Sequence, residues 1–282
     1  MVFALLAGAT FGALAVLIRR ALARGGDPEV GGLVTTGCAS LVAILAAAPT
    51  AGGGIDIAGI APFYAIGLLV PGMSQIVFIH AIRLAGAART SLVIGVAPLV
   101  SVAIALLFLD EPLHWLLLVA TIAIVLGGVT LAGEGARPAH FRLLGIVLAL
   151  GCAVSFGVRD NLVRTATGDA PVLQGTAASL LGAMTTVGVY LLLFRRRRIQ
   201  DTWRRTLRTF APAGVVLGLA YAFLVIGFDR GRVSIVAPLN ATQSLFAVLF
   251  AGAVLHDERV TRRTVLAGLF VVAGAAIIGA VR

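Results

Sequence analysis

The chain has 282 residues, of which 60% are hydrophobic and 12% are charged. This composition and a mean hydropathy of +1.05 exclude an ordinary soluble domain. The formal net charge of +10 would fit nucleic-acid binding, but the arginines lie between apolar segments and not on one soluble face, so we expect no nucleic-acid partner.

Ten apolar segments, each near the roughly 20 residues that a spanning helix needs, occupy most of the chain. They are predicted at residues 2–18, 30–49, 58–82, 91–109, 113–133, 143–163, 171–194, 210–228, 233–255 and 264–281. No connection between them is long enough to fold by itself. The predicted fold class is therefore an all-α integral membrane protein with ten transmembrane helices in one membrane domain.

The arginine distribution predicts the orientation of these helices. The connections after the first, third, fifth, seventh and ninth segments carry 17 of the 22 arginines. Because basic residues prefer the cytoplasmic side of short connections, both termini are predicted to lie outside, in a bacterial inner membrane. The arginine-rich connection 195–209 is interpreted as a topology anchor, with contact to anionic lipids as the alternative.

The pattern of segments repeats after the fifth. At an offset of 147 residues, Arg83 matches Arg230 and Asp110-Glu111 matches Asp257-Glu258. A five-helix unit repeated in tandem is inverted in the bilayer, so residues 1–136 and 137–282 are predicted as two inverted repeats with a substrate site between them. We interpret the acidic pairs as caps of the helices that follow, with proton coupling as the alternative.

Polar and aromatic side chains inside the segments are the candidates for a substrate site. A polar group in hydrocarbon needs a protein partner or a water-filled cavity. The alternative for each is a hydrogen bond between helices, or simple packing. The candidate substrate-binding residues are Ser74, Gln75, Phe78, His80, Phe156, Arg159, Asp160, Tyr221, Asn240 and Gln243.

Arg159 and Asp160 carry the sharpest functional hypothesis. They lie toward one end of the sixth segment, where they can form an interfacial ion pair. In the functional interpretation, Arg159 attracts a substrate carboxylate through its planar fork while Asp160 faces an ammonium group. Asn240 and Gln243 are three residues apart, so we expect them to share one helix face and to suit a neutral or zwitterionic ligand.

Two features of the third segment leave alternatives open. Pro71-Gly72 is expected to loosen the helix and to free carbonyl groups that can face a ligand. His80 is expected either to make a local hydrogen bond or to line the cavity.

Two stretches resemble a known family. Phe78–Arg83 with Thr90–Val93, and Ala97–Leu99 leading to Leu109–Pro112, resemble the third and fourth helices of the EamA-like transporters. These form the ten-helix branch of the drug/metabolite transporter superfamily, and within it YddG-type amino-acid exporters are the type suggested. The resemblance implies that segments 3, 4, 8 and 9 surround the substrate, with segments 1 and 6 beside them. Leu245 occupies the position in the second repeat that matches Pro98. Whether segment nine bends is therefore left open.

The sequence lacks the motifs of the main alternative classes. It holds no phosphate-binding G-x-x-x-x-G-K-[ST], no H-E-x-x-H and no G-x-S-x-G, so we expect no cofactor and no enzyme activity. The predicted function is a secondary transporter that exports small metabolites, amino acids by preference, through alternating access. The alternatives are an exporter of cationic drugs, with Asp160 as the carboxylate, and a passive channel or scaffold. A small-molecule substrate and the lipid bilayer are the expected partners, and monomer and homodimer both stay open.

Overall fold

The computed structural model describes residues 1–109, 115–130, 142–168 and 171–255, together with positions 263, 266, 267, 269, 270, 273, 274 and 277. Both acidic pairs that we interpreted as caps, Asp110-Glu111 and Asp257-Glu258, lie outside these residues. So does more than half of the tenth predicted segment.

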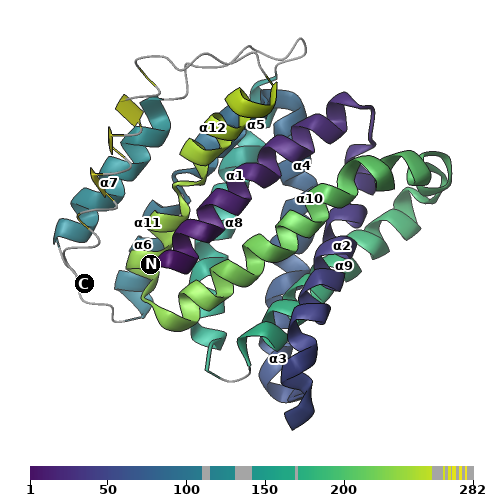
Figure 1. Cartoon of the computed structure of the whole chain (residues 1–282), viewed down its shortest axis with the longest axis horizontal. Coiled ribbons are helices and arrows are strands. Elements are labelled where there is room, and N and C mark those ends of the chain that lie inside the picture. The colour runs from purple at the N-terminus through teal and green to yellow at the C-terminus, as the bar shows by residue number, and fades with distance from the viewer. Residues whose placement is uncertain are drawn as a thin grey trace.

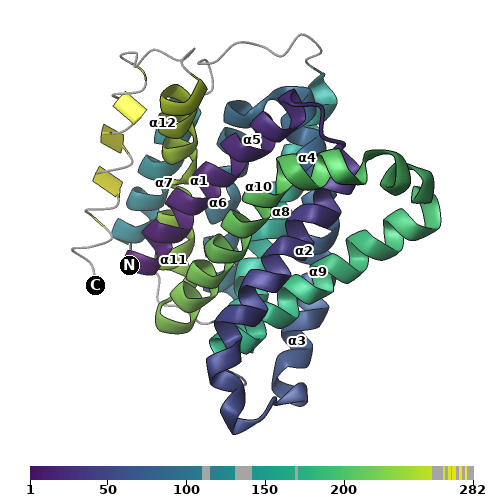
Figure 2. The same cartoon turned by 45° about the vertical axis from the view of Figure 1, so that its right-hand side comes forward.

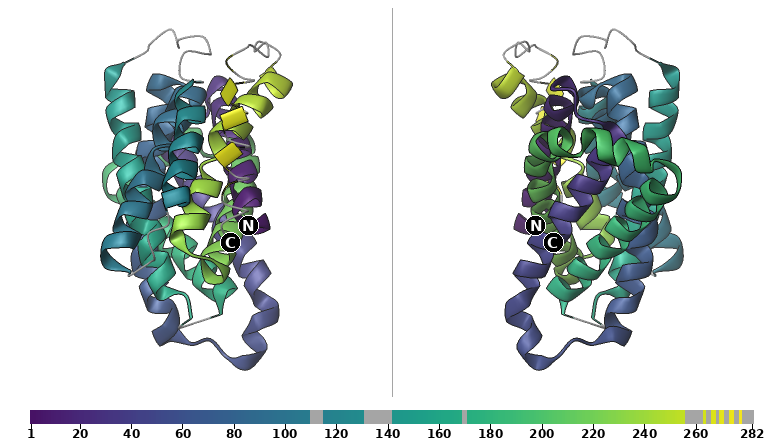
Figure 3. Two further views of the ribbon diagram at one scale, coloured as in Figure 1. Left: turned by 90° about the vertical axis from the view of Figure 1, so that its left-hand side faces the viewer. Right: turned by 90° about the vertical axis from the view of Figure 1, so that its right-hand side faces the viewer.

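The described residues form helices and short connections (Figure 1). The first part contains α1 (Val2–Ala23), α2 (Pro28–Ala47), the 3-10 helix η1 (Ala48–Gly53), α3 (Ile57–Gly67), the π-helix η2 (Leu68–Met73), α4 (Ser74–Ala85), α5 (Ala87–Ile94), α6 (Ala97–Phe108) and α7 (Trp115–Thr130). The second part contains α8 (Leu143–Ala166), α9 (Val172–Phe194), α10 (Arg196–Arg230), α11 (Val233–Asn240) and α12 (Gln243–Leu255). The helices run roughly along one common direction (Figure 3).

Within the described ranges, seven helical stretches are long and apolar enough to cross a membrane. They are Val2–Ala23, Pro28–Thr50, Ile57–Ala85, Leu143–Ala166, Val172–Phe194, Arg196–Arg230 and Val233–Ala253. Ala97–Phe108 and Trp115–Gly127 are shorter apolar helices. The all-helical architecture agrees with the predicted fold class, whereas the ten-helix arrangement in two inverted repeats stays a prediction.

Glycines allow the central helices to approach closely. Helix α10 lies beside α1 and α2 (Figures 1 and 2). A Cβ atom at Gly214 of α10 would lie 2.5 Å from Cβ of Cys38, and one at Gly218 would lie 2.9 Å from the carbonyl oxygen of Ala39. Small residues at such contacts are how helices pack in lipid, where the hydrophobic effect does not drive them together.

The third predicted segment is interrupted between α3 and α4. Val70 leaves the helical region, with φ −139° and ψ 113°, and the next residue, Pro71, has no N–H to donate. The Thr186 hydroxyl donates to the carbonyl oxygen of Leu68 at 2.8 Å, and the Tyr221 hydroxyl donates to that of Val70 at 3.2 Å. The loosened helix was predicted correctly, and these two carbonyl groups accept hydrogen bonds from hydroxyl groups of the protein.

The ninth segment is interrupted as well, which answers the question that Leu245 left open. Helix α11 ends at Asn240 and α12 begins at Gln243. Pro238 contributes to this interruption because it cannot donate a backbone hydrogen bond inside α11. Asn240 ends α11 and Gln243 begins α12, so the two residues belong to two separate helices, and a shared face stays a prediction.

Two hydroxyl groups satisfy the backbone at this second interruption. The Thr242 hydroxyl donates to the carbonyl oxygen of Leu239 at 2.7 Å, and the Ser244 hydroxyl donates to that of Ala241 at 3.1 Å. Such local hydrogen bonds compete with the regular helical pattern and favour a bend. These two hydrogen bonds satisfy carbonyl groups that the interrupted helix leaves without a backbone partner. An unsatisfied carbonyl group would be costly in an apolar environment.

The arginine-rich stretch is part of a helix, which corrects our expectation of a connection over 195–209. Helix α10 begins at Arg196 and has 35 residues. At 1.5 Å per residue it is about 52 Å long, well beyond the roughly 30 Å of hydrocarbon in a bilayer. Arginine is a good helix former, so the charged stretch extends the apolar helix instead of ending it.

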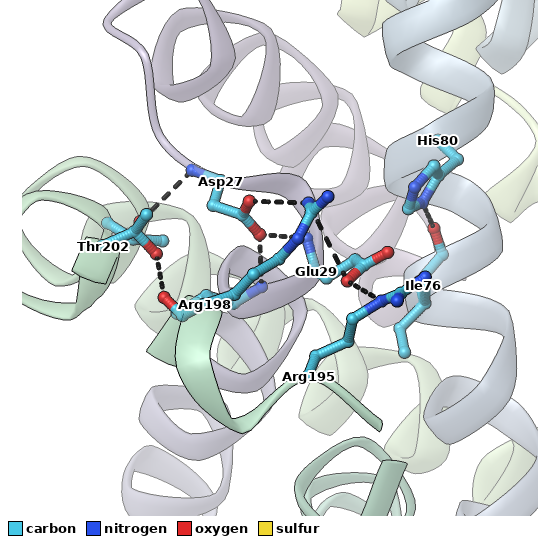
Figure 4. A network of polar contacts seen from close by, with 9 residues as sticks. Asp27, Glu29, Ile76, His80, Arg195, Arg198 and Thr202 are labelled. Atoms are coloured by element: carbon cyan, nitrogen blue, oxygen red, sulfur yellow. Dashed lines mark hydrogen bonds and ion pairs between the residues drawn. The ribbon is translucent and has the colours of Figure 1, made fainter. Parts of the chain in front are cut away.

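An ionic network joins the start of α2 to the start of α10 (Figure 4). Asp27 caps α2 by accepting from the backbone N–H of Glu29 at 2.9 Å. Glu29 is buried, and its Oε2 lies 3.1 Å from Nε of Arg195, while Oδ2 of Asp27 lies 3.2 Å from Nη1 of Arg198. The carboxylate of Glu29, followed by Tyr190, raises the pKa of Arg195 above its ordinary value.

Candidate functional site

A buried ion pair on α8 forms the centre of the candidate site. Nε and Nη2 of Arg159 donate to Oδ1 of Asp160 at 3.1 and 2.5 Å, and both side chains are only 5% exposed. The two residues lie about 10 Å from the nearer end of α8. The ion pair was one of the two predicted alternatives, and it is buried inside the helix bundle.

Helix α6 supplies a partner for this pair. The Ser101 hydroxyl donates to Oδ2 of Asp160 at 2.8 Å, and the Asn161 amide donates to the carbonyl oxygen of Ser101 at 3.0 Å. Gly157 makes this approach possible, because a Cβ atom there would lie 2.7 Å from Cβ of Val100. Ser101 was not among the predicted residues. Its only signal in the sequence is a hydroxyl within the apolar run that follows Pro98.

Two aromatic rings flank the guanidinium group. Cζ of Arg159 lies 5.1 Å from the ring centroid of Phe156 and 5.6 Å from that of Tyr221. A guanidinium within about 6 Å of a ring face is stabilised by the ring quadrupole, more strongly when water is excluded. Four predicted residues, Phe156, Arg159, Asp160 and Tyr221, thus come together although Tyr221 belongs to α10.

A cavity of about 390 Å³ lies between α8 and the interrupted third segment. Arg159 and Ser74 line it together with mainly apolar residues, which include Ile66, Leu69, Met73, Val77, Val154 and Val158. The Ser74 hydroxyl is buried and has no hydrogen-bond partner within the described part of the chain. A cavity of this size, with apolar walls and few polar groups, suits a small amphiphilic molecule.

The other candidates on α4 do not line this cavity. The Gln75 amide donates to the Thr35 hydroxyl at 3.1 Å, which matches the alternative of a hydrogen bond between helices. Nδ1 of His80 lies 2.9 Å from the carbonyl oxygen of Ile76, one turn earlier on the same helix (Figure 4). Phe78 is buried in the hydrophobic core.

Asn240 and Gln243 lie at the interruption of the ninth segment, against α1. A Cβ atom at Gly8 of α1 would lie 3.1 Å from the carbonyl oxygen of Asn240 and 3.3 Å from the backbone nitrogen of Gln243. Oδ1 of Asn240 is buried without a hydrogen-bond partner among the described residues. Neither residue lines the cavity beside Arg159.

Apolar helices of membrane length, two of them interrupted beside buried polar groups, are typical of multi-pass membrane transport proteins. The profile of the EamA-like transporter family matches residues 1–132 and 143–280. The chain therefore belongs to the EamA-like transporter family, which consists of multi-pass membrane transporters of small metabolites and not of enzymes.

Comparison with solved structures gives the same fold. One crystal structure aligns over 98% of this chain and 99% of its own length, with a TM-score of 0.74 and 21% sequence identity. At this level of identity the likeness shows the fold alone. A comparison with curated protein sequences finds no match.

Proposed function

We propose that the protein is a secondary transporter that exports amino acids by alternating access, with the Arg159–Asp160 pair and the adjoining cavity as its substrate site. The buried ion pair is the observation that carries this proposal. Taking two charges out of water is costly, so charged residues inside membrane helices generally mark a substrate or ion pathway.

The chemistry of the pair fits a zwitterion. A substrate carboxylate can take the place of Asp160 on the planar guanidinium of Arg159, with the two-point geometry that arginine favours. The substrate ammonium can then face Asp160 and the rings of Phe156 and Tyr221. Neighbouring helical residues project about 100° apart, so each charged residue serves a different end of the substrate.

The cavity favours an amino acid with an apolar side chain. Its volume of about 390 Å³ is at the lower end of the range for small-molecule sites, and its walls are mainly apolar. The Ser74 hydroxyl, which has no hydrogen-bond partner among the described residues, offers one further hydrogen bond to a bound substrate.

The contacts of Asp160 favour this proposal over an exporter of cationic drugs. Both carboxylate oxygens are engaged, Oδ1 by Arg159 and Oδ2 by Ser101. A lipophilic cation would have to compete with the guanidinium, whereas a zwitterion offers that guanidinium a replacement carboxylate.

The proposal includes rocking of residues 1–136 against 137–282, with both termini outside the bacterial inner membrane. The interruptions of the third and ninth segments support it, because discontinuous helices near the bilayer midplane are common at carrier substrate sites.

Counterflow in proteoliposomes tests the proposal. We expect vesicles loaded with an apolar amino acid to accumulate the labelled form, and the unlabelled amino acid to compete. The methyl ester lacks the carboxylate and the N-acetyl derivative lacks the ammonium, so both should compete poorly. We expect Arg159→Gln to abolish counterflow and Arg83→Gln, which removes the same charge at an exposed site, to preserve it.

Each contrary result identifies another function. Stronger competition by the ester or by organic cations would favour the cation exporter. Downhill flux without counterflow would indicate a passive channel, because a pore does not exchange. No flux with any member of the panel would contradict a transporter of this substrate class.

A further inference from the structure

A second cavity, of about 930 Å³, lies between α9 and the first turns of α10, away from the site described above. These two helices form the hairpin at the right-hand edge of Figure 2. One wall of the cavity is apolar and comes from α9, with Met184, Val189 and Leu192, all exposed. Exposed apolar side chains on a membrane helix are positioned to contact lipid chains.

The other wall comes from α10 and holds most of the polar residues of the cavity, together with Ile199. Trp203, Arg204 and Arg205 line it, and Asp201 is an acidic residue beside them. In the described part of the chain, neither arginine forms an ion pair with Asp201 within 4.0 Å. The two positive charges therefore stay available to a ligand and outnumber the single negative one.

The two guanidinium groups differ in how they are held. Nε and Nη2 of Arg205 donate to the carbonyl oxygen of Arg24 at 3.1 and 2.8 Å. Since a guanidinium has five N–H donors, this contact fixes Arg205 and leaves donors for another group. Arg204 is exposed and is not engaged by other described residues.

The position of the cavity agrees with the boundary of a membrane. Helix α10 is longer than the hydrocarbon is thick, and the polar wall belongs to its first turns, which extend beyond the hydrocarbon. Tryptophan is enriched at membrane–water interfaces, and clusters of arginine next to a spanning helix attract anionic lipids. Arg196, Arg197 and Arg208 add to the positive charge around this end of α10, where Arg195 and Arg198 are paired with Glu29 and Asp27.

We propose that this cavity binds one anionic phospholipid, with the phosphate against Arg204 and Arg205 and an acyl chain along the α9 wall. Its two different walls carry the proposal. A neutral lipid would match the apolar wall but not the two arginines, and a free phosphate would match the arginines but not the apolar wall. The proposal does not depend on which substrate the protein transports.

Trp203 provides a direct probe, because the chain has only two tryptophans. Trp115 is 65% exposed, so Trp115→Phe should leave Trp203 as the single fluorophore without disturbing the fold. The protein is reconstituted in phosphatidylcholine vesicles with increasing fractions of brominated phosphatidylglycerol or brominated phosphatidylcholine. We expect the anionic lipid to quench Trp203 at a roughly fivefold lower mole fraction.

Three variants in this background separate a specific site from general attraction. Arg204→Gln should remove most of the preference, while Arg197→Gln, an equal loss of charge at an exposed residue that does not line the cavity, should keep it. Gly188→Leu should weaken quenching by both lipids, because Gly188 lines the cavity and its added side chain would fill the apolar part.

Three results would overturn the proposal. Equal quenching by the two lipids, or equal losses in Arg204→Gln and Arg197→Gln, would show only diffuse attraction. Relief of the quenching by inorganic phosphate alone would identify a phosphate site without an acyl chain.

Discussion

Arg159 and Asp160 stabilise each other's charge inside the bundle. Either charge buried without its partner would keep its full desolvation penalty. We expect Arg159→Gln or Asp160→Asn to destabilise the protein by about 3–5 kcal/mol, because each leaves the opposite charge buried without its partner. The double variant should cost clearly less than the sum of the two. Unfolding in detergent measures all three, and strictly additive losses would show that the two residues act independently.

Tyr221 contributes a hydroxyl as well as a ring. Tyr221→Phe keeps the ring near Arg159 but removes the hydrogen bond to the Val70 carbonyl oxygen, so we expect a loss of about 1 kcal/mol in stability. Tyr64→Phe is the matched control, since the Tyr64 hydroxyl donates to Thr185 at an exposed position. An equal effect of both variants on the melting temperature would contradict a stabilising contribution of the hydrogen bond between Tyr221 and Val70.

The sequence predicted the residues of the proposed site better than it predicted their contacts. Arg159 and Asp160 were candidates because a charge in an apolar segment is visible locally. It did not identify Ser101, because a hydroxyl is common in such segments and its partner lies 59 residues away. His80 and Gln75 were candidates on the same reasoning, yet both have other partners in this structure.

At the scale of elements, glycine contacts decide how closely helices pack. A Cβ atom at Gly67 would overlap the carbonyl oxygen of Ser179 on α9, and backbone cannot move aside as a side chain can. We expect Gly67→Ala to lower stability by about 1–3 kcal/mol, the usual cost of overpacking. Gly151→Ala is the control, because nothing lies within 4 Å of the added methyl group. Similar melting temperatures for both variants would contradict close packing of α3 on α9.

The two helix interruptions differ in how far the local sequence predicts them. Pro71 predicted the one in the third segment, because a missing donor is a property of one residue. The one in the ninth segment was left open, since it depends on Pro238 together with the hydroxyls of Thr242 and Ser244. A serine or threonine hydroxyl can donate to any of several nearby carbonyl groups. The periodicity of the sequence does not reveal which one it binds.

At the scale of the molecule, the network of Asp27 and Glu29 with Arg195 and Arg198 joins parts of the chain far apart in sequence. Both arginines are about half exposed, so salt should screen the contact. We expect Glu29→Gln to melt at a lower temperature than the unmodified protein at about 0.01 M salt, and the difference to shrink at about 1 M.

Asp56→Asn serves as the control for this measurement. Asp56 accepts from the backbone N–H of Gly59 at the start of α3 and has no arginine partner among the described residues. The effect of this substitution should therefore depend much less on salt. A difference for Glu29→Gln that is constant from low to high salt would contradict an ionic contribution.

The sequence by itself determined the membrane class, the all-helical architecture and the likeness to the EamA-like family. Apolar length is a property of each segment alone, because the bilayer sets it and no partner helix is needed. Only the tertiary structure decided that Ser101, Phe156 and Tyr221 surround the ion pair, and that the freed carbonyl groups accept from hydroxyls of the protein. Hydrogen bonds and cavities depend on spatial distances of a few ångströms between helices that are far apart in sequence. The hydrophobic periodicity of a segment gives no information on these distances.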